Sequence, residues 1–135
     1  MKFLSSHLLS TFDKIKCGFV YGDDNTEFNF RHVDVDIFMS RRSQFEKQTG
    51  MQLVKVYQTH STNIIHFKQS DISDIDRFLN IEADGILTNV QNVAIGVVTA
   101  DCVPVLVYAS DIWCIAILHS GWKGSLNGIN EKLVD

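Results

Sequence analysis

The sequence has little of what marks several large classes of protein. It contains one proline and three cysteines in 135 residues, and each apolar run is shorter than the roughly 18 residues of a membrane span. The odd number of cysteines, with Cys102 and Cys114 inside apolar runs, favours a reduced, cytoplasmic protein over a disulfide-linked secreted one. Polar residues interrupt residues 1–7, so a signal peptide is not expected.

An excess of positive charge is also missing. The formal net charge is −4, which argues against general binding to nucleic acid or to anionic membranes. Hydrophobic residues make up 45% of the chain and charged residues 21%, and this balance provides enough apolar surface for a core. We therefore expect a single domain over residues 1–135.

Short apolar segments predict most of the secondary structure. Residues 3–15 fit either a strand followed by a turn or a short helix. Residues 69–80 are polar and acidic, and they predict a surface loop with a brief helix near residues 75–79. Alternating or β-branched apolar residues predict strands elsewhere, over residues 17–22, 53–58, 64–67, 86–88, 93–98, 103–108 and 112–118, the last two as adjacent buried strands.

Helix signals complete a mixed α/β prediction. Asp36 suits the N-cap of a helix that runs to about Thr49, and Gly50 suits its end. Arg41 and Arg42 predict a solvated face of this helix. Residues 124–135 predict a final helix without a C-cap, so we expect the chain to be the N-terminal part of a longer fold. Strands flanked by helices are typical of a mixed α/β class.

Three side chains of the types that bind metal ions stand at strand ends. His60 follows the strand at 53–58, Cys102 precedes the strand at 103–108, and His119 ends the strand at 112–118. Zinc prefers thiolate and imidazole ligands, and three protein ligands leave one position open, as in catalytic sites. Their separations are much larger than those of zinc fingers, so the alternative is a core thiol and two hydrogen-bonded surface histidines.

Two acidic residues and a glycine-rich turn accompany these three side chains. Asp101 precedes Cys102, and Asp84 precedes a glycine; either carboxylate would orient a ligating imidazole or accept a proton. Asp84 suits an Asx-type turn equally well. The turn at 119–124 ends a strand and starts a helix, where backbone N–H groups favour an anion such as phosphate. Its candidate phosphate ligands are Gly121, Lys123 and Gly124, while Trp122 suits stacking on a base or packing.

The remaining histidines and cysteines have no partner spacing that indicates a site. We interpret the histidines as structural or exposed and the cysteines as core thiols; these are His7, His32 and His66, and Cys17 and Cys114.

Four motifs occur in one order: Gln58-Thr59-His60, Ala-Asp-Gly-Ile-Leu-Thr at 83–88, Ala-Asp-Cys-Val-Pro-Val-Leu at 100–106, and His-Ser-Gly-Trp-Lys-Gly at 119–124. Together they resemble the family named polyphenol oxidase or multicopper laccase, also called the YfiH or peptidoglycan-editing-factor family, over roughly residues 17 to 135. The resemblance implies a cytoplasmic zinc enzyme with phosphorylase activity on adenosine, inosine and methylthioadenosine, and with adenosine deaminase activity. It also implies that His60, Cys102 and His119 are the metal ligands.

The sequence departs from the family pattern at several points. Family members are commonly much longer, and their C-terminal half with its Gly-Pro-Cys-type motif is absent here. Residues 20–23 replace the usual basic, glycine-rich turn after the first strand. Lys123 stands where arginine is commoner, and lysine cannot offer a bidentate fork to phosphate.

These observations leave three functional hypotheses. In the first, zinc activates water for attack at the purine C6, or phosphate attacks the ribose C1′, with Asp84 or Asp101 transferring a proton. In the second, a metal-free hydrolase or deamidase uses Cys102 as nucleophile and His119 as base, since the family's fold is similar to that of a toxin deamidase. The third is a truncated zinc-binding protein without turnover. Copper is less favoured, because three ligands are too few for a multicopper centre.

Overall fold

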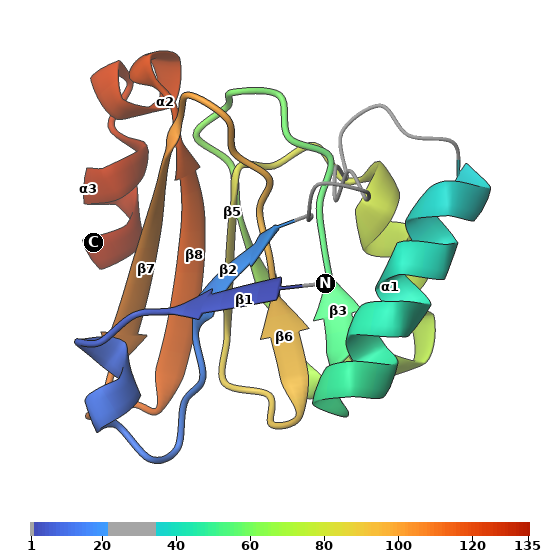
Figure 1. Ribbon diagram of the computed structural model, residues 1–135. Helices are drawn as coiled ribbons and strands as arrows, with labels where there is room; N and C mark the ends of the chain where they lie inside the picture. Colours follow the sequence, from blue (N-terminus) through green and yellow to red (C-terminus); the bar gives the residue numbers. More distant parts are fainter. Residues whose placement is uncertain (1, 22–34) are drawn as a thin grey trace. The chain divides into compact units, whose positions relative to one another are not determined.

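The computed structural model describes residues 2–21 and 35–135, which form two compact units, Met1–Phe45 and Glu46–Asp135 (Figure 1). In the first unit, β1 (Lys2–Ser5) pairs antiparallel with β2 (Gly18–Tyr21), and the short 3-10 helix η1 (Leu9–Thr11) lies between them in sequence. This confirms the strand predicted at 17–22 and the strand-and-turn alternative at the N-terminus. The sequence Gly-Asp-Asp-Asn at 22–25, which predicts a turn after this strand, lies outside the described residues.

Helix α1 (Val35–Thr49) ends where the sequence predicts. Gly50 follows it with a φ of +71°, the left-handed conformation that glycine adopts without a side-chain penalty. The predicted start was wrong, because Asp36 lies inside the first turn and not at the N-cap. The prediction that Arg41 and Arg42 lie on a solvated face of this helix was also only partly correct, since Arg42 is buried.

A four-stranded sheet forms the main part of the second unit, in the order β4-β5-β8-β7. Strand β4 (Ile64–Phe67) is parallel to β5 (Gly85–Thr88), whereas β8 (Cys114–Ser120) is antiparallel to both β5 and β7 (Val103–Ala109). The predicted adjacent strands at 103–108 and 112–118 are therefore confirmed. The prediction that both are buried was wrong for β7, which lies at the sheet edge and leaves Val103 61% exposed.

A second, smaller sheet pairs β3 (Gln52–Val54) with β6 (Val93–Ile95) in parallel. Both strands are shorter than the predicted ranges 53–58 and 93–98. In the segment between β3 and β4, strand-like pairing is limited to an isolated parallel bridge between Tyr57 and Glu82. The segments after β3 and β6 are therefore irregular, and they lead to His60 and to Cys102.

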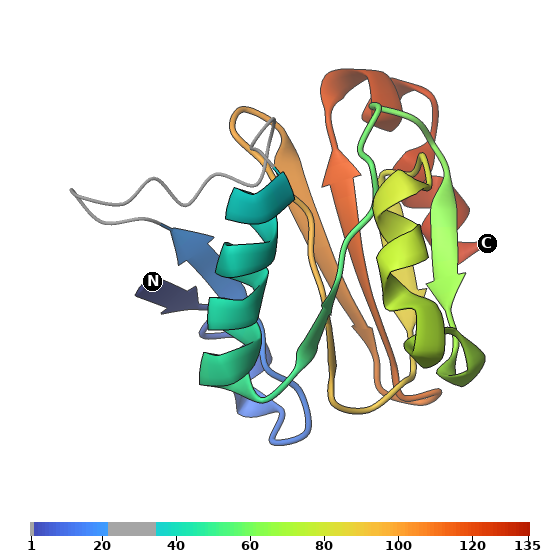
Figure 2. The ribbon, with the colours of Figure 1, turned by 90° about the vertical axis from the view of Figure 1, so that its right-hand side faces the viewer.

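The segment η2 (Gln69–Asn80) is a 3-10 helical segment with a kink at Asp74, beside β4 in Figure 2. The predicted surface loop was thus wrong for most of this segment, whereas the brief helix predicted near residues 75–79 is confirmed as part of η2. Ile72, Ile75 and Phe78 recur every third residue, which matches the three residues per turn of a 3-10 helix and places them on one face. This face joins the core, whose buried members are Val54, Val56, Phe67, Ile75, Phe78, Ala83, Ile86, Val90 and Val93.

Two short helices, α2 (Trp122–Leu126) and α3 (Ile129–Val134), follow β8. The prediction of one helix over 124–135 was wrong, because Gly128 takes a left-handed φ of +84° and ends the first helix. Both helices contact β8 (Figure 1). Among the helices of residues 2–21 and 35–135, none is long and apolar enough to span a membrane.

Candidate metal centre

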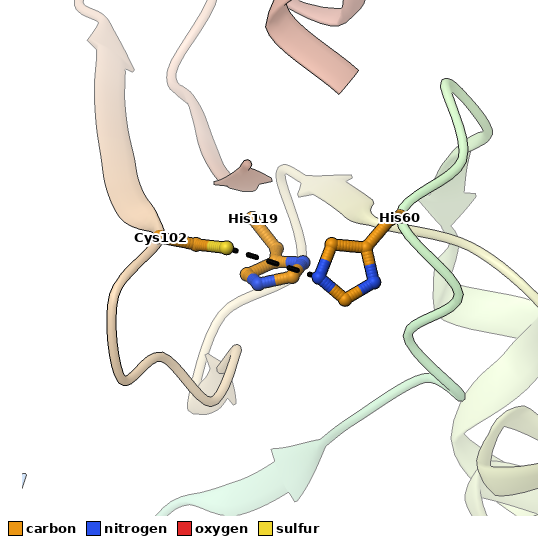
Figure 3. A group of neighbouring side chains, drawn as sticks. All are labelled: His60, Cys102 and His119. Carbon is orange, nitrogen blue, oxygen red and sulfur yellow. Dashed lines mark hydrogen bonds between the residues drawn. The ribbon is translucent and has the colours of Figure 1, made fainter. Parts of the chain in front are cut away.

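His60, Cys102 and His119 meet at one end of the main sheet (Figure 3). Their ligand atoms all lie within 4.8 Å of one another. The Cys102 Sγ is 3.8 Å from the His60 Nε2, and the two imidazole rings stand edge to face with centroids 4.8 Å apart. His119 is buried, while His60 and Cys102 are half-buried. The structure thus brings together the three side chains that the sequence indicated as candidate metal ligands.

Strand pairing explains how two of these residues meet. In the antiparallel pair β7–β8, Val103 lies opposite Ser120 and Pro104 lies opposite His119. Cys102, which immediately precedes β7, is therefore level with Gly121 and close to His119. Antiparallel neighbours bring the start of one strand to the end of the next, so this register places a thiol beside an imidazole.

The carboxylate of Asp84 organises the two histidines. It is fully buried and accepts a 2.8 Å hydrogen bond from the His119 Nδ1. It also accepts the backbone N–H groups of Thr59, His60 and Ser61 at 3.1, 3.0 and 2.6 Å, and the Ser61 hydroxyl at 2.8 Å. Because the Nδ1–H of His119 faces Asp84, its Nε2 is left for a metal ion, as in carboxylate–histidine–metal triads.

His60 has an unusual backbone conformation, with a φ of +60°. For a residue other than glycine, this left-handed conformation costs on the order of 1 kcal/mol or more. The three successive N–H groups around His60 converge on the Asp84 carboxylate, forming an anion-binding concavity. The buried charge therefore stabilises the strained turn that presents the His60 ring.

Two opposing effects determine the charge of Asp84. Burial raises the pKa of Asp84, but the hydrogen bonds from His119, Ser61 and Thr59 favour the carboxylate and hold its pKa below the usual range. Asp84 is thus ionised at neutral pH, and both oxygens already accept hydrogen bonds from the protein. The sequence left two roles open for Asp84, which are to orient a ligating imidazole or to accept a proton. This arrangement suits the first.

The glycine-rich turn contributes a close approach to the ligands. A Cβ at Gly121 would lie 2.8 Å from the Cys102 Sγ and 3.1 Å from the His60 Cδ2. Gly124 is also buried, and a Cβ there would lie 3.4 Å from both Ile129 Cγ2 and the Ser61 carbonyl oxygen. Gly121 therefore leaves the space in which the thiol and the imidazole face each other.

The other predicted site residues lie on the exposed side. Asp101 and Lys123 are exposed, and the Lys123 Nζ lies 5.6 Å from the centre of the Trp122 ring. Trp122 is 73% exposed, so it does not pack into the core. These side chains are free to contact a bound molecule, but the structure does not fix them as it fixes Asp84.

Two polar residues near His60, Ser61 and Gln58, make side-chain hydrogen bonds that the sequence did not predict. Ser61 adds two of the donors to Asp84, and the Gln58 side chain bonds to the backbone of Val98. Their only signal in the sequence is their place in a polar segment around His60, and this pattern gives no partner for either side chain.

The histidines and cysteines outside the site partly follow their predictions. His7 and His66 are exposed, while His32 lies outside the described residues. Cys17 and Cys114 are only half-buried, so the prediction of core thiols was wrong in degree. Burial raises the pKa of the Cys114 thiol, which disfavours a reactive thiolate there.

The donor set fits a divalent metal ion such as zinc. Two imidazoles and one thiol converge, one imidazole is oriented by a buried carboxylate, and three protein ligands leave a further position for water or substrate. The half-buried thiol and His60 place the group at the surface of the second unit.

Comparison with known proteins identifies the family that the chain resembles in sequence and fold. The family model described as "Multi-copper polyphenol oxidoreductase laccase" matches residues 10–135. A purine nucleoside phosphorylase of Haemophilus influenzae is 40% identical over 97 residues, which cover 70% of this chain and 37% of the relative. Another from Clostridium acetobutylicum is 42% identical over 77 residues, covering 57% and 30%. An adenosine deaminase, RL5, from an unknown prokaryote is 34% identical over 87 residues, covering 62% and 33%.

Solved structures share the fold. The YfiH protein of Bacillus licheniformis has a TM-score of 0.64 and 30% identity, over 73% of this chain and 39% of that chain. A Neisseria meningitidis protein of family DUF152 has a TM-score of 0.73 over 98% and 55%, and at 24% identity it is evidence for the fold alone. The mixed α/β class and the predicted resemblance are confirmed. The matched parts of this chain span 30–37% of the length of the curated relatives above.

Proposed function

We propose that this chain, which belongs to the multi-copper polyphenol oxidoreductase laccase family, provides the metal site of an enzyme that acts on purine nucleosides. One observation carries the proposal: His60, Cys102 and His119 converge within 4.8 Å, and the buried Asp84 orients His119. The substrate class rests on relatives named purine nucleoside phosphorylase and adenosine deaminase.

In this proposal zinc is held by the Cys102 Sγ and the Nε2 atoms of His60 and His119. A zinc ion so bound lowers the pKa of a coordinated water molecule and stabilises negative charge that develops on a substrate. The chain's own part is to keep Cys102 and the imidazoles free to ligate. Asp84 does so by accepting the Nδ1–H of His119 and by holding the His60 turn.

Substrate contacts are assigned to the exposed side of the site. Lys123, with the backbone N–H groups of the turn from Gly121 to Gly124, is the proposed phosphate-binding group. The exposed Trp122 ring offers a flat surface for a purine base. Asp101 is the proposed proton acceptor, because it is exposed beside Cys102 whereas the oxygens of Asp84 are already engaged. These groups support phosphorolysis of adenosine, inosine and methylthioadenosine, and deamination of adenosine.

A metal-free cysteine hydrolase is the second candidate, and one contact favours it. The Cys102 thiol lies 3.8 Å from the His60 Nε2, so an imidazole stands beside a nucleophilic sulfur. In the structure the hydrogen-bond partner of the thiol is His60, which would replace His119 as the base in this mechanism. Its signature is activity that survives a chelator and is lost when Cys102 is alkylated.

Metal content and turnover in matched variants test the proposal. The 135-residue chain is expressed with His60→Ala, Cys102→Ala and the exposed-histidine control His66→Ala; zinc is measured by elemental analysis and products of adenosine with phosphate by chromatography. We expect about one zinc per chain and formation of adenine or inosine in the wild type and in His66→Ala, and neither in the two ligand variants. A folded, metal-free wild type whose activity resists chelator would instead establish the cysteine hydrolase.

A further inference from the structure

We propose that Gln58 is a positioning residue that sets the spacing between the Cys102 thiol and the His60 imidazole. The inference rests on the proposed metal site and adds to it a side chain outside the ligand set. Its basis is a pair of reciprocal hydrogen bonds. The Gln58 Nε2 donates to the Val98 carbonyl oxygen at 2.8 Å, and the Val98 N–H donates to the Gln58 Oε1 at 2.7 Å.

This pair continues the backbone ladder of the smaller sheet. Strands β3 and β6 pair as far as Val54 and Ile95, and the Gly96 N–H then donates to the Val54 carbonyl oxygen at 3.1 Å. Beyond that point, the side-chain amide of Gln58 connects the two segments. A primary amide presents an N–H and its C=O on the same side, as a strand residue presents its own N–H and C=O to the residue opposite, so it can replace a strand partner.

The connection lies close to two of the three proposed ligands. Gln58 stands two residues before His60, and Val98 stands four residues before Cys102. The same His60 turn is joined to His119 through the carboxylate of Asp84. The turn therefore has two anchors: Asp84 relates His60 to His119, and Gln58 relates His60 to the segment that carries Cys102.

This division of roles predicts a specific defect when Gln58 is replaced. Asp84 still holds the two imidazoles, so the nitrogen ligands keep their places. The segment of residues 96–101 loses its link to the His60 turn, so the thiol moves relative to the imidazoles. A general loss of stability would weaken metal binding by all three side chains together. The proposed role of Gln58 predicts instead that binding by the Cys102 sulfur weakens first.

Cobalt(II) binding separates these two effects, because a thiolate ligand adds a near-ultraviolet sulfur-to-cobalt charge-transfer band that imidazole ligands do not produce. The chain is compared with Gln58→Met, which removes both hydrogen bonds at similar size, and with Gln58→Glu, which removes the donor. Gln91→Met is the control, the same exchange at an exposed glutamine. Zinc affinity is measured in parallel by competition with a coloured chelator, and folding of the metal-free chains by circular dichroism.

We expect Gln58→Met to fold, to bind zinc about tenfold to a hundredfold more weakly, as for other residues that orient metal ligands, and to lose charge-transfer intensity relative to the visible cobalt bands. Gln58→Glu should show the same defect, and Gln91→Met should match the wild type. If Gln58→Met folds and keeps the zinc affinity and the charge-transfer intensity of the wild type, the role of Gln58 is overturned, but the proposed metal site is not. A wild type that binds no metal would contradict both proposals. Unfolding of both Gln58 variants would also overturn the positioning role, since the amide would then hold the fold as a whole.

Discussion

The two sides of the candidate site are built very differently. On the buried side, Asp84 has no exposed surface and accepts five hydrogen bonds that place His60 and His119. On the exposed side, Trp122 and Lys123 contact each other and extend toward solvent. Contacts within this chain therefore fix the positions of the candidate metal ligands, whereas the groups proposed to bind substrate are exposed and have few contacts.

Removal of the Asp84 carboxylate is the most severe test of the buried side. Asp84→Ala leaves the N–H groups of Thr59, His60 and Ser61 and the His119 Nδ1 without their acceptor. Buried donors without partners each cost about 1–3 kcal/mol, so we expect the free energy of unfolding to fall by about 3 kcal/mol or more, with loss of zinc binding. Urea denaturation of the metal-free chain and a zinc titration measure both effects.

Asp111→Ala, at an exposed aspartate, is the matched control for that experiment. It should change the free energy of unfolding by less than about 0.5 kcal/mol. An Asp84→Ala chain as stable and as zinc-competent as the control would show that the buried side does not depend on this carboxylate.

Filling the space at Gly121 should damage the metal site more than the fold. In Gly121→Ala the new Cβ would lie 2.8 Å from the Cys102 Sγ, so the thiol and the His60 ring must move apart. We expect a loss of stability of about 1–3 kcal/mol and a zinc affinity at least about tenfold lower. Competition with a coloured chelator provides the affinity.

The control for Gly121 is Gly96→Ala, where the new Cβ meets only the end of the Leu53 side chain, at 3.3 Å. This variant should retain the zinc affinity of the wild type. Equal affinities for the two alanine variants would mean that the close approach at Gly121 has no bearing on the ligands.

The exposed side should respond in the opposite way. Trp122→Ala and Lys123→Ala remove solvent-facing atoms, so each should change the free energy of unfolding by less than about 0.5 kcal/mol and leave zinc affinity unchanged. Nucleoside binding, measured by calorimetry, should weaken for Trp122→Ala, and phosphate binding for Lys123→Ala. Leu126→Ala, a neighbouring exposed position, should bind both as the wild type does; equal binding in all three variants would argue against this surface as the substrate side.

The smallest expected effect is a pH-dependent change in stability at Lys55, a residue of the second unit outside the candidate site. Burial lowers the pKa of Lys55, so folding favours its neutral form and a charged Lys55 reduces stability. This penalty is fully present below the folded pKa and disappears as the pH rises toward the unfolded value. Lys55→Met should therefore melt slightly above the wild type at pH 7, and by a smaller margin near pH 10.

Lys68→Met, at an exposed lysine, provides the reference for that melting experiment. A stability gain for Lys55→Met that grew with pH would contradict the assignment of the effect to a buried charge.

The sequence was sufficient to single out the three side chains that converge and to predict two adjacent strands beside them. Cys102 precedes one of these strands and His119 ends the other, and the antiparallel pairing seen in the structure brings the two side chains together. It was insufficient for the supporting contacts. The bonds of Asp84 to residues 59–61 and of Gln58 to Val98 join positions 23 to 40 residues apart, so they exist only once the chain has folded.

The errors in the predicted secondary structure have a similar origin. The apolar residues of η2 recur every third residue among aspartates and polar side chains, a period that fits neither an α-helix nor a strand. Gly128 breaks the last helix through its left-handed backbone, a conformation that composition does not reveal. In both places the decisive factor is backbone geometry, which hydrophobic patterning does not report.

X-ray absorption at the zinc edge of the zinc-loaded chain identifies the atoms bound to the metal and so tests the proposed ligands themselves. We expect one sulfur at about 2.3 Å and imidazole nitrogens at about 2.0–2.1 Å, with the sulfur contribution absent in Cys102→Ser. A first shell made only of nitrogen and oxygen in the wild type, or a shell unchanged in Cys102→Ser, would contradict the assignment of His60, Cys102 and His119 as the metal ligands.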